Sequence, residues 1–386
     1  MEKINELMKK YDINACSVTI VKNYEVSLSE GFGKNIDTET KFMAGSVSKP
    51  VFALGVMLLN GSKKINIDKD VNEYLTSWKV PSERNFVPKI TLRQLLSHTA
   101  GTTTHGFTGY NRKDKIPTII QILNGEKPSN SDKVVVDTIP GTTIKYSGGG
   151  TTIAQLTICD KLKKDFPDIM DELLFKKMDL SCSYQQPIGK YKLTNYAKGY
   201  TDEGKVKGDY HIYPEMAAAG LWTNSLDLAK IGIEICKGFH NKSDIFDKKM
   251  IKQILTPTYK YSDGKRGRGI GFSLKEDNFF HVGLDEGYIS DFNFNKNGNG
   301  FVIMINNSSE NAFKFIRDLK DIIYDILNWD NENKIIPTLG LEKYEGKYYD
   351  KLNNLKENIT SSVITGELAL IRSIFNIWNA YALFLT

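Results

Sequence analysis

Apolar residues recur along this chain with two different periods, one helical and one extended. Over residues 2–10 and 310–328 they recur every three or four positions, which is typical of an amphipathic helix. Residues 46–59 are apolar on nearly every side, as expected of a buried helix. The same criteria predict shorter helices over 91–101, 152–162, 168–177, 225–237 and 247–255.

Strand patterns lie on both sides of this helical region. Apolar and polar residues that alternate between turn residues predict strands over 16–21, 25–28, 269–275, 278–283, 287–295 and 300–306. The last four follow one another closely, and the turns between them contain Asp, Asn and Gly, as in Lys296-Asn297-Gly298-Asn299-Gly300. This spacing predicts an antiparallel meander.

The order of the predicted elements is strands, then helices, then strands, then a helix. This order predicts an α+β fold, in which terminal helices pack on one antiparallel sheet and a mainly helical subdomain is inserted over about 60–225. A chain of 386 residues can hold one large domain or two ordinary ones. We expect a single domain over residues 1–330.

The character of the chain changes after residue 330. The sequence Tyr344-Glu345-Gly346-Lys347-Tyr348-Tyr349 predicts the start of a β element, and too few residues follow it to complete a β domain. We therefore expect 331–386 to be a C-terminal extension with a truncated β element. Its apolar run over 363–385 carries Glu367 and Arg372, which makes it a poor candidate for a membrane span.

Composition and charge narrow the choice of function. Lys and Arg number 51 against 46 for Asp and Glu, and this net charge of +5 is spread along the chain, which disfavours nucleic-acid binding. The four cysteines and five histidines show no metal-ligand spacing, so we expect no metal ion or other cofactor. Residues 1–11 are charged and lack the apolar core of a secretory signal, from which we expect a cytoplasmic protein.

The strongest candidate chemistry lies at the start of the buried helix, where Ser46 and Lys49 form the pattern Ser-x-x-Lys. Residues three apart on a helix share one face, so we expect the hydroxyl and the amine to lie side by side. A serine hydroxyl becomes a good nucleophile when a base removes its proton. Lysine can be that base if its pKa falls from about 10.4 towards neutrality, and burial and the positive helix end both favour this fall.

Three other motifs carry less information. His98 lies near a predicted helix end, where a histidine is more often structural than catalytic. Gly148-Gly149-Gly150 precedes a helix but lacks the Gly-Lys-Ser/Thr ending of a phosphate-binding loop, and we expect it to allow a tight turn that fixes Tyr146. Gly267-Arg268-Gly269-Ile270-Gly271 resembles a dinucleotide fingerprint, but it leads into a strand instead of a helix, so we reject that interpretation.

Three motifs stand in the order of one known family. Ser46-x-x-Lys49, Tyr146-Ser147-Gly148 and His281-Val282-Gly283 resemble the active-site motifs of serine β-lactamases and penicillin-binding proteins. The tyrosine makes the set similar to class C β-lactamases and their esterase and peptidase relatives. Residues 95–101 and 217–221 resemble structural signatures of the same family. The resemblance spans about residues 10–330 and implies a β-lactamase/transpeptidase-like fold.

The resemblance also implies a role for each motif. Ser46 would be the nucleophile, and Lys49 and Tyr146 would share the general acid/base work. The backbone N–H groups of Ser46 and Leu284 would form the oxyanion hole. The substrate-binding residues implied by the resemblance are Gly148, His281, Gly283 and Leu284.

Two positions depart from the family pattern. Gly148 stands where asparagine is common, so a contact to a substrate amide is lost. His281 stands where a lysine commonly helps to bind the substrate carboxylate, and a histidine is charged only part of the time at neutral pH. Both departures disfavour an efficient β-lactamase and are typical of relatives described as esterases or D-amino-acid peptidases.

We therefore expect a serine hydrolase that cleaves an ester or amide through a covalent acyl-enzyme on Ser46, with a small-molecule ester, amide or peptide as substrate. One alternative is a β-lactamase or a penicillin-binding D-alanyl carboxypeptidase. A second is an inactive binding or sensing module of the same fold, which the presence of Ser46, Lys49 and Tyr146 together disfavours. We expect substrate specificity to lie in loops such as 102–139 and 256–268.

Overall fold

The computed structural model describes residues 2–81, 88–186, 194–329, 346–349 and 356–359. The chain divides into two compact units, Met1–Trp329 and Asp330–Thr386. In the second unit, strands β15 (Gly346–Tyr349) and β16 (Lys356–Ile359) pair in antiparallel fashion, and β15 coincides with the β element predicted near residue 344. The apolar run over 363–385 lies outside the described residues. That 331–386 form a truncated extension stays a prediction.

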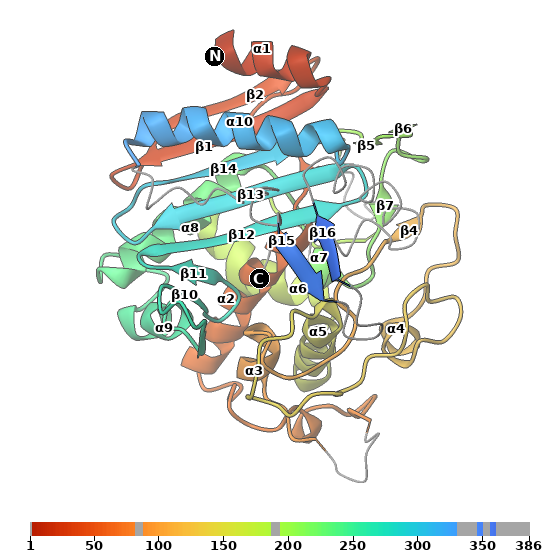
Figure 1. The fold of residues 1–386 in the computed structure, drawn as a ribbon. Coiled ribbons are helices and arrows are strands. Elements are labelled where there is room, and N and C mark those ends of the chain that lie inside the picture. The colour runs from red at the N-terminus through yellow and green to blue at the C-terminus, as the bar shows by residue number, and fades with distance from the viewer. Residues whose placement is uncertain (1, 82–87, 187–193, 330–345, 350–355, 360–386) are drawn as a thin grey trace. The chain divides into compact units, whose positions relative to one another are not determined.

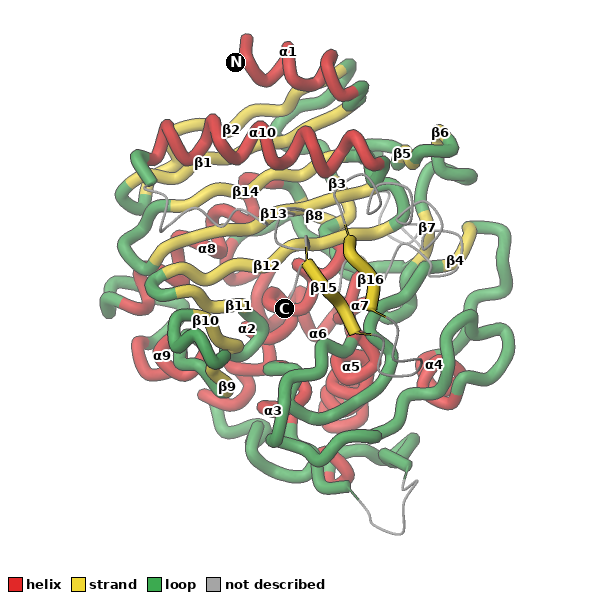
Figure 2. Tube along the Cα trace, viewed as in Figure 1, coloured by secondary structure: helices red, strands yellow, loops and turns green. Residues whose placement is uncertain are grey.

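One antiparallel sheet of eight strands organises the first unit (Figures 1 and 2). The strand order is β2-β1-β14-β13-β12-β11-β10-β9, so the first strands of the chain complete the sheet beside the last one of the unit. The bounds are β1 (Ala15–Lys22), β2 (Glu25–Gly33), β9 (Tyr259–Lys260), β10 (Arg266–Arg268), β11 (Ser273–Lys275), β12 (Asn278–Asp285), β13 (Tyr288–Asn295) and β14 (Gly300–Ile305). The predicted meander is confirmed, and so is the α+β fold class.

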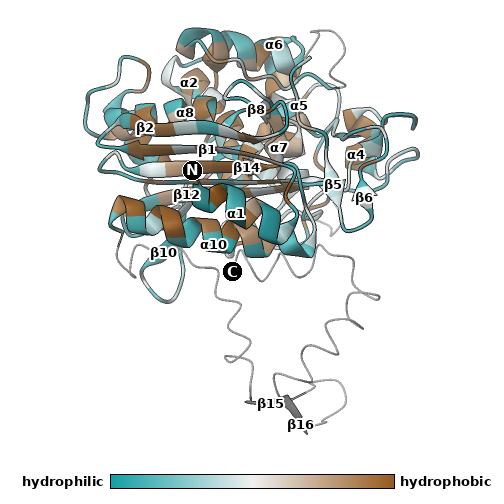
Figure 3. Ribbon diagram, turned by 90° about the horizontal axis from the view of Figure 1, so that it is seen from above, coloured by the Kyte–Doolittle hydropathy of each residue, from teal (hydrophilic) through white to brown (hydrophobic). Residues whose placement is uncertain are grey.

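Helices cover both faces of this sheet. The helices are α1 (Glu2–Tyr11), α2 (Ser48–Gly61), α3 (Leu92–Leu96), α4 (Ile119–Asn124), α5 (Gly148–Leu162), α6 (Phe166–Met170), α7 (Met216–Ala219), α8 (Ser225–Phe239), α9 (Lys248–Ile254) and α10 (Glu310–Leu327). Figure 3 shows α1 and α10 on one face and α2, α5, α6 and α8 on the other. Because both faces are covered, β14 is apolar and buried along its whole length instead of alternating.

Short elements complete the first unit. Three short 3-10 helices are η1 (Gly45–Val47), η2 (Val71–Glu73) and η4 (Lys176–Met178). A short π-helix is η3 (Asp171–Phe175). Three two-residue strand pairs join β3 (Phe42–Met43) to β8 (Trp222–Thr223), β4 (Tyr110–Asn111) to β7 (His211–Ile212), and β5 (Tyr200–Thr201) to β6 (Gly204–Lys205). The first two pairs join segments that are far apart in the sequence, whereas β5 and β6 form a short hairpin.

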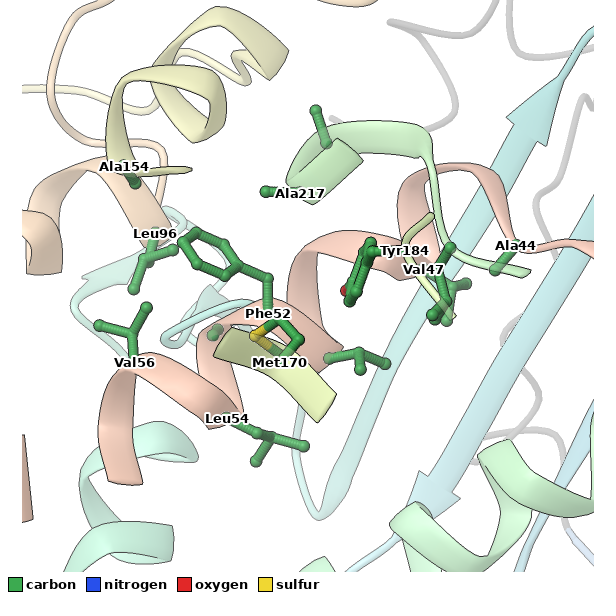
Figure 4. Close-up of a cluster of buried hydrophobic side chains, with 14 of the residues drawn as sticks. Ala44, Val47, Phe52, Leu54, Val56, Leu96, Ala154, Met170, Tyr184 and Ala217 are labelled. Atoms are coloured by element: carbon green, nitrogen blue, oxygen red, sulfur yellow. The ribbon is translucent and has the colours of Figure 1, made fainter. Parts of the chain in front are cut away.

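Helix α2 lies at the centre of the main apolar core (Figure 4). Phe52 and Leu54 of α2 are fully buried, and Phe52 packs edge-on against Phe166 of α6 with ring centres 5.3 Å apart. Met170 and Tyr184 close the same cluster. The prediction of a helix that is apolar on nearly every side is therefore confirmed, and this burial fixes the position of the residues at its start.

The structure corrects the boundaries of several predicted elements. The helix predicted over 91–101 is limited to α3, and the one predicted over 168–177 is α6 followed by the turns η3 and η4. The helix predicted over 46–59 is a 3-10 turn, η1, followed by α2 from Ser48. The helix predicted from residue 152 begins at Gly148, because loop carbonyls accept the hydrogen bonds of its glycine amides and the glycines therefore join the first turn. The strand predicted over 269–275 is reduced to β11, since residues 269–272 form a loop whose glycine Gly271 has φ +82°.

Candidate active site

Ser46 and Lys49 lie together where η1 runs into α2. The Lys49 side-chain nitrogen Nζ is 2.8 Å from Ser46 Oγ and donates a hydrogen bond, also 2.8 Å, to the carbonyl of Ala218 in α7. Lys49 is only 4% exposed, whereas Ser46 is half-buried. The predicted pairing is confirmed, and it presents an accessible hydroxyl held by a buried amine.

Strand β12 lies directly against η1 and leaves no room for side chains there. Gly45 has φ +51°, and a Cβ atom at this position would lie 2.6 Å from the backbone nitrogen of Leu284. A Cβ atom on Gly283 would lie 1.9 Å from the carbonyl oxygen of Ala44. The two glycines therefore permit a backbone contact that brings the Leu284 amide beside the turn that carries Ser46, as the predicted oxyanion hole requires.

Tyr146 lies on the other side of the lysine, just before α5. Lys49 Nζ is 5.0 Å from the centre of the Tyr146 ring. The Tyr146 hydroxyl is buried and has no hydrogen-bond partner among the described residues. Lys49 therefore contacts Tyr146 through the face of its ring. The Tyr146 hydroxyl is available to hydrogen-bond a bound molecule.

His98 holds the Tyr146 motif in place. Its ring lies 4.2 Å from the Tyr146 ring, and its Nδ1 accepts a hydrogen bond of 3.2 Å from the backbone N–H of Ser147. Burial, followed by the charges of Arg268 and Lys49, lowers the pKa of His98 well below its ordinary value. A neutral histidine that accepts a backbone hydrogen bond supports the structural role that is more common for a residue at a helix end.

His281 lies in β12 with its ring 6.1 Å from that of Tyr146. It is 1% exposed, its Nδ1 lies 2.8 Å from the Val282 carbonyl, and its Nε2 has no partner among the described residues. Burial and then the Lys49 and Arg268 charges lower its pKa well below the ordinary value. The partial charge expected from the sequence is therefore wrong for this environment, and His281 offers hydrogen bonds without a cation.

Comparisons with known proteins identify the family of the chain. The family model described as Beta-lactamase matches residues 2–323. The chain belongs to the beta-lactamase family. Protein flp of Staphylococcus aureus (strain N315) is 22% identical over 96% of this chain and 73% of its own length.

Solved structures show the same fold. The octameric penicillin-binding protein homologue from Pyrococcus abyssi has a TM-score of 0.70 at 20% identity, covering 93% of this chain and 84% of its own. EstCE1, a hydrolase with promiscuous acyltransferase activity, has a TM-score of 0.65 at 16% identity, covering 84% and 98%. The chain therefore shares its fold with both proteins.

Arg268 is a residue of this beta-lactamase-family site that the motif analysis did not select. Its guanidinium carbon lies 5.7 Å from the centre of the Tyr146 ring, the side chain is 3% exposed, and Nη1 donates to Ser273 Oγ at 2.6 Å. A guanidinium stays charged at any ordinary pH. The site thus contains a fixed cation that the neutral His281 does not supply.

Two buried carboxyl groups also lie near the site. Glu215 precedes α7 and Asp285 ends β12, and within the described ranges none of their carboxylate oxygens has a hydrogen-bond partner. Burial raises the pKa of Glu215 to about 8 and that of Asp285 well above its usual range, although the Lys49 charge opposes the second shift. The Glu215 carboxyl is therefore mainly neutral near pH 7.

The residues missed by the sequence analysis share one property: no motif spacing marks them. Arg268 lies at the end of the loop 256–268 that was expected to set specificity, and His105 lies in the other such loop, 102–139.

Over the ranges that the structure describes, no group of three or more His, Cys, Asp or Glu side chains could hold a metal ion. None of the described helices is both long and apolar enough to cross a bilayer.

Proposed function

We propose that this chain is a serine hydrolase that cleaves an ester or amide through an acyl-enzyme on Ser46. The observation that carries the proposal is the 2.8 Å contact between Lys49 Nζ and the half-buried Ser46 Oγ. A nucleophile within hydrogen-bond reach of a base is the arrangement that covalent catalysis requires.

The chemistry follows from the roles of these groups. With Lys49 as an uncharged amine, Ser46 Oγ attacks the substrate carbonyl carbon while its proton passes to Lys49 Nζ, and the backbone amides of Ser46 and Leu284 bind the oxyanion that forms. The bond to the leaving group then breaks, and the proton leaves with it, with Tyr146 as the second acid/base. Water attacks the acyl-enzyme in the same way and returns the serine.

Labelling with a fluorophosphonate tests the nucleophile. Intact-mass spectrometry should show one covalent adduct on the wild type and none on Ser46→Ala. Ser181→Ala is a matched control, because Ser181 Oγ also contacts a lysine, Lys41, yet donates at 2.7 Å to Asp227, so its lysine is paired with a carboxylate. An adduct that survives Ser46→Ala, or that is lost in Ser181→Ala, would contradict the assignment. A folded wild type without any adduct would favour the inactive binding module.

Arg268 favours a second candidate, a penicillin-binding carboxypeptidase or β-lactamase. Its buried charge suits a substrate with a carboxylate beside the scissile bond. The test is a chromogenic cephalosporin and a peptide ending in D-Ala-D-Ala, each compared with its carboxyl ester. Arg268→Gln should raise KM for the free acids far more than for the esters. Equal changes in KM for the free acids and for their esters would favour the ester or amide hydrolase over this second candidate.

A further inference from the structure

A pocket lined by α3, by α9 and by the segment 256–258 shares no residue with the proposed active site. Its volume is about 660 Å³, and we call it the α9 pocket. Four cationic side chains line it, and no acidic side chain does. The cations are Arg93 of α3 and Lys248, Lys249 and Lys252 of α9. This composition suits an anionic ligand.

Both walls of the α9 pocket are held by the rest of the first unit. Arg93 donates from Nε and Nη2 to the two carboxylate oxygens of Asp68, at 2.5 and 2.9 Å. On the other wall, the backbone N–H of Thr258 donates to the Arg268 carbonyl of β10 at 2.7 Å. Arg93 is therefore a fixed cation opposite a helix that carries three lysines.

The three lysines of α9 have no anionic partner. All three are exposed, and in the described ranges none of them makes a hydrogen bond or an ion pair. The acidic residue next to them, Asp247, caps the helix by accepting from the Met250 N–H at 2.8 Å. Lys248 and Lys252 are one turn apart, and like charges at this spacing destabilise a helix. A bound anion would remove this repulsion.

Positive charge is concentrated in the sequence around this pocket. Residues 248–275 contain eight Lys or Arg and one Asp or Glu, which leaves 43 basic and 45 acidic residues in the rest of the chain. The positive charge that we expected to be spread along the chain is therefore concentrated in this segment. A concentration of one sign of charge attracts oppositely charged ligands.

Gln253 adds a second requirement for the ligand. Its side chain lines the α9 pocket, and its Oε1 atom is buried without a hydrogen-bond partner in the described parts of the chain. A carbonyl oxygen can only accept, and leaving it buried and unpaired is unfavourable. The ligand that fits should therefore carry a hydroxyl or N–H donor beside its anionic group.

We propose that the α9 pocket binds a phosphorylated polyol, the class of which glycerol phosphate is the simplest member. Phosphate oxygens accept charge-assisted hydrogen bonds from several ammonium groups at once. The polyol supplies the hydroxyl donor for Gln253. This chemistry occurs both in free sugar and glycerol phosphates and in the headgroup of phosphatidylglycerol, and the site is additional to the hydrolase function proposed above.

Two probes on the full chain distinguish these sources. Titration calorimetry with glycerol 3-phosphate reports the free ligand, at about 20 mM salt so that screening is weak. Co-sedimentation with vesicles of equal parts phosphatidylglycerol and phosphatidylcholine reports the lipid, with vesicles of phosphatidylcholine alone as the neutral reference. Binding of either probe supports the site, and the stronger one identifies the source.

A triple variant tests the lysines. Lys248→Gln/Lys249→Gln/Lys252→Gln should weaken binding by about 10- to 100-fold, because each lysine near an anionic group contributes to affinity. The matched control is Lys3→Gln/Lys9→Gln/Lys22→Gln, which removes the same charge from exposed lysines of α1 and the end of β1, toward the opposite edge of the sheet (Figure 1). The control should change the affinity by less than about threefold.

Gln253→Leu tests the hydroxyl contact. It should weaken glycerol 3-phosphate binding by about 3- to 10-fold, the usual effect of one hydrogen bond. Binding of sulfate, which has the charge but no hydroxyl donor, should be unchanged by this substitution. Thermal unfolding without ligand shows whether each variant is folded.

Three results would overturn the proposal. The first is a folded wild type that binds neither glycerol 3-phosphate nor the anionic vesicles. The second is an equal loss of binding in the two triple variants, which would show an effect of net charge alone. The third is a single-stranded oligonucleotide that binds more tightly than either probe and does not respond to Gln253→Leu, which would show a general polyanion surface.

Discussion

At the scale of single residues, the site combines one well-paired group with several unpaired ones. Lys49 is fully engaged, with hydrogen bonds to Ser46 and Ala218. The Tyr146 hydroxyl, His281 Nε2 and His105 Nδ1 are buried and lack partners among the described residues. Groups of this kind lower stability unless a ligand or water pairs with them. Their concentration around one tyrosine supports a binding role for this part of the molecule.

Tyr146→Phe separates the hydroxyl from the ring. The substitution keeps the ring face that contacts Lys49 and His98 and removes only the unpaired oxygen. If the hydroxyl transfers protons, kcat should fall by about 10²- to 10⁴-fold, the range of general acid/base effects. Removing an unpaired buried hydroxyl should leave the free energy of unfolding equal or higher.

Kinetics of a double variant complete this prediction. Because residues that act as a unit are not additive, Lys49→Met/Tyr146→Phe should be little slower than the slower single variant. The measurement is kcat on one activated ester for all four proteins. Multiplied losses in the double variant would contradict a shared proton path.

The Glu215 carboxyl should make stability depend on pH. Its pKa of about 8 in the folded protein lies above the ordinary value of 4.5. The folded state therefore keeps a proton that the unfolded state has released, so stability falls as pH rises from about 4.5 to 8. Glu215→Gln should remove this loss and exceed the wild type in unfolding free energy at pH 8 by on the order of a few kcal/mol, but not at pH 4.5.

Urea unfolding at pH 4.5, 6.5 and 8 measures this difference. Glu203→Gln serves as the control, because Glu203 is exposed in the turn between β5 and β6 and should follow the wild type at each pH. A difference between Glu215→Gln and the wild type that is the same at all three pH values would show that this carboxyl does not titrate between the folded and unfolded states as described.

At the scale of elements, the contact between η1 and β12 decides the geometry of the site. Gly45→Ala and Gly264→Ala form a matched pair, since φ is +51° and +68° at these positions, but a Cβ atom at Gly264 meets nothing within 4 Å. Gly264→Ala should lower the free energy of unfolding only by the cost of a left-handed backbone at alanine, about 1–2 kcal/mol, and Ser46 should be labelled at the normal rate. Gly45→Ala should lower the free energy of unfolding by more than this. It should also slow the labelling of Ser46 at least tenfold, because the added Cβ atom forces the Leu284 amide to move.

Two measurements check this pair. Urea unfolding gives the loss of stability in each variant, and the rate of fluorophosphonate labelling reports on the oxyanion site. Equal effects of the two substitutions on both measurements would show that the approach of β12 to η1 is not needed for the position of Ser46.

Elements with strong periodicity could be predicted, and short ones could not. The amphipathic helix α10 and the alternating strands β12 to β14 follow from patterns many residues long. β3 and β8 have two residues each, too few for any period, and they exist because the Phe42 and Thr223 backbones are brought together by the fold. The start of α5 was hidden because three glycines normally disfavour a helix, and here the carbonyls of the loop at His105 and the Ser147 hydroxyl accept hydrogen bonds from their amides.

The candidate site divides in the same way. Ser46 and Lys49 are three residues apart, so local geometry alone predicts their contact. Arg268 and His105 contact the Tyr146 ring from two separate segments, and nothing in their spacing marks them. The charge of His281 depends on its burial, which only the packed structure reveals.

At the scale of the whole molecule, the first unit should be independent of the second. The last described residue of the unit, Trp329, packs against Tyr324 and Phe301 with ring centres 5.7 and 6.0 Å apart. A chain ending at residue 333 keeps these contacts. We expect it to fold, with the melting temperature and the rate of Ser46 labelling of the full chain. Insolubility, or a much lower melting temperature, would show that residues 334–386 belong to the core.

The pairing of β1 with β14 also has a consequence during synthesis on the ribosome. Cys16 lies opposite Ile305, and the Ala15 N–H donates to Asn306, so the hairpin of β1 and β2 emerges early and finds its partner only when the sheet is nearly complete. At about 5–20 residues per second this wait lasts roughly 15–60 s. One edge of an apolar hairpin is exposed throughout, which invites chaperones and aggregation. Substitutions that slow the formation of β13 and β14 should therefore lower the yield in cells before they change the stability of the finished protein.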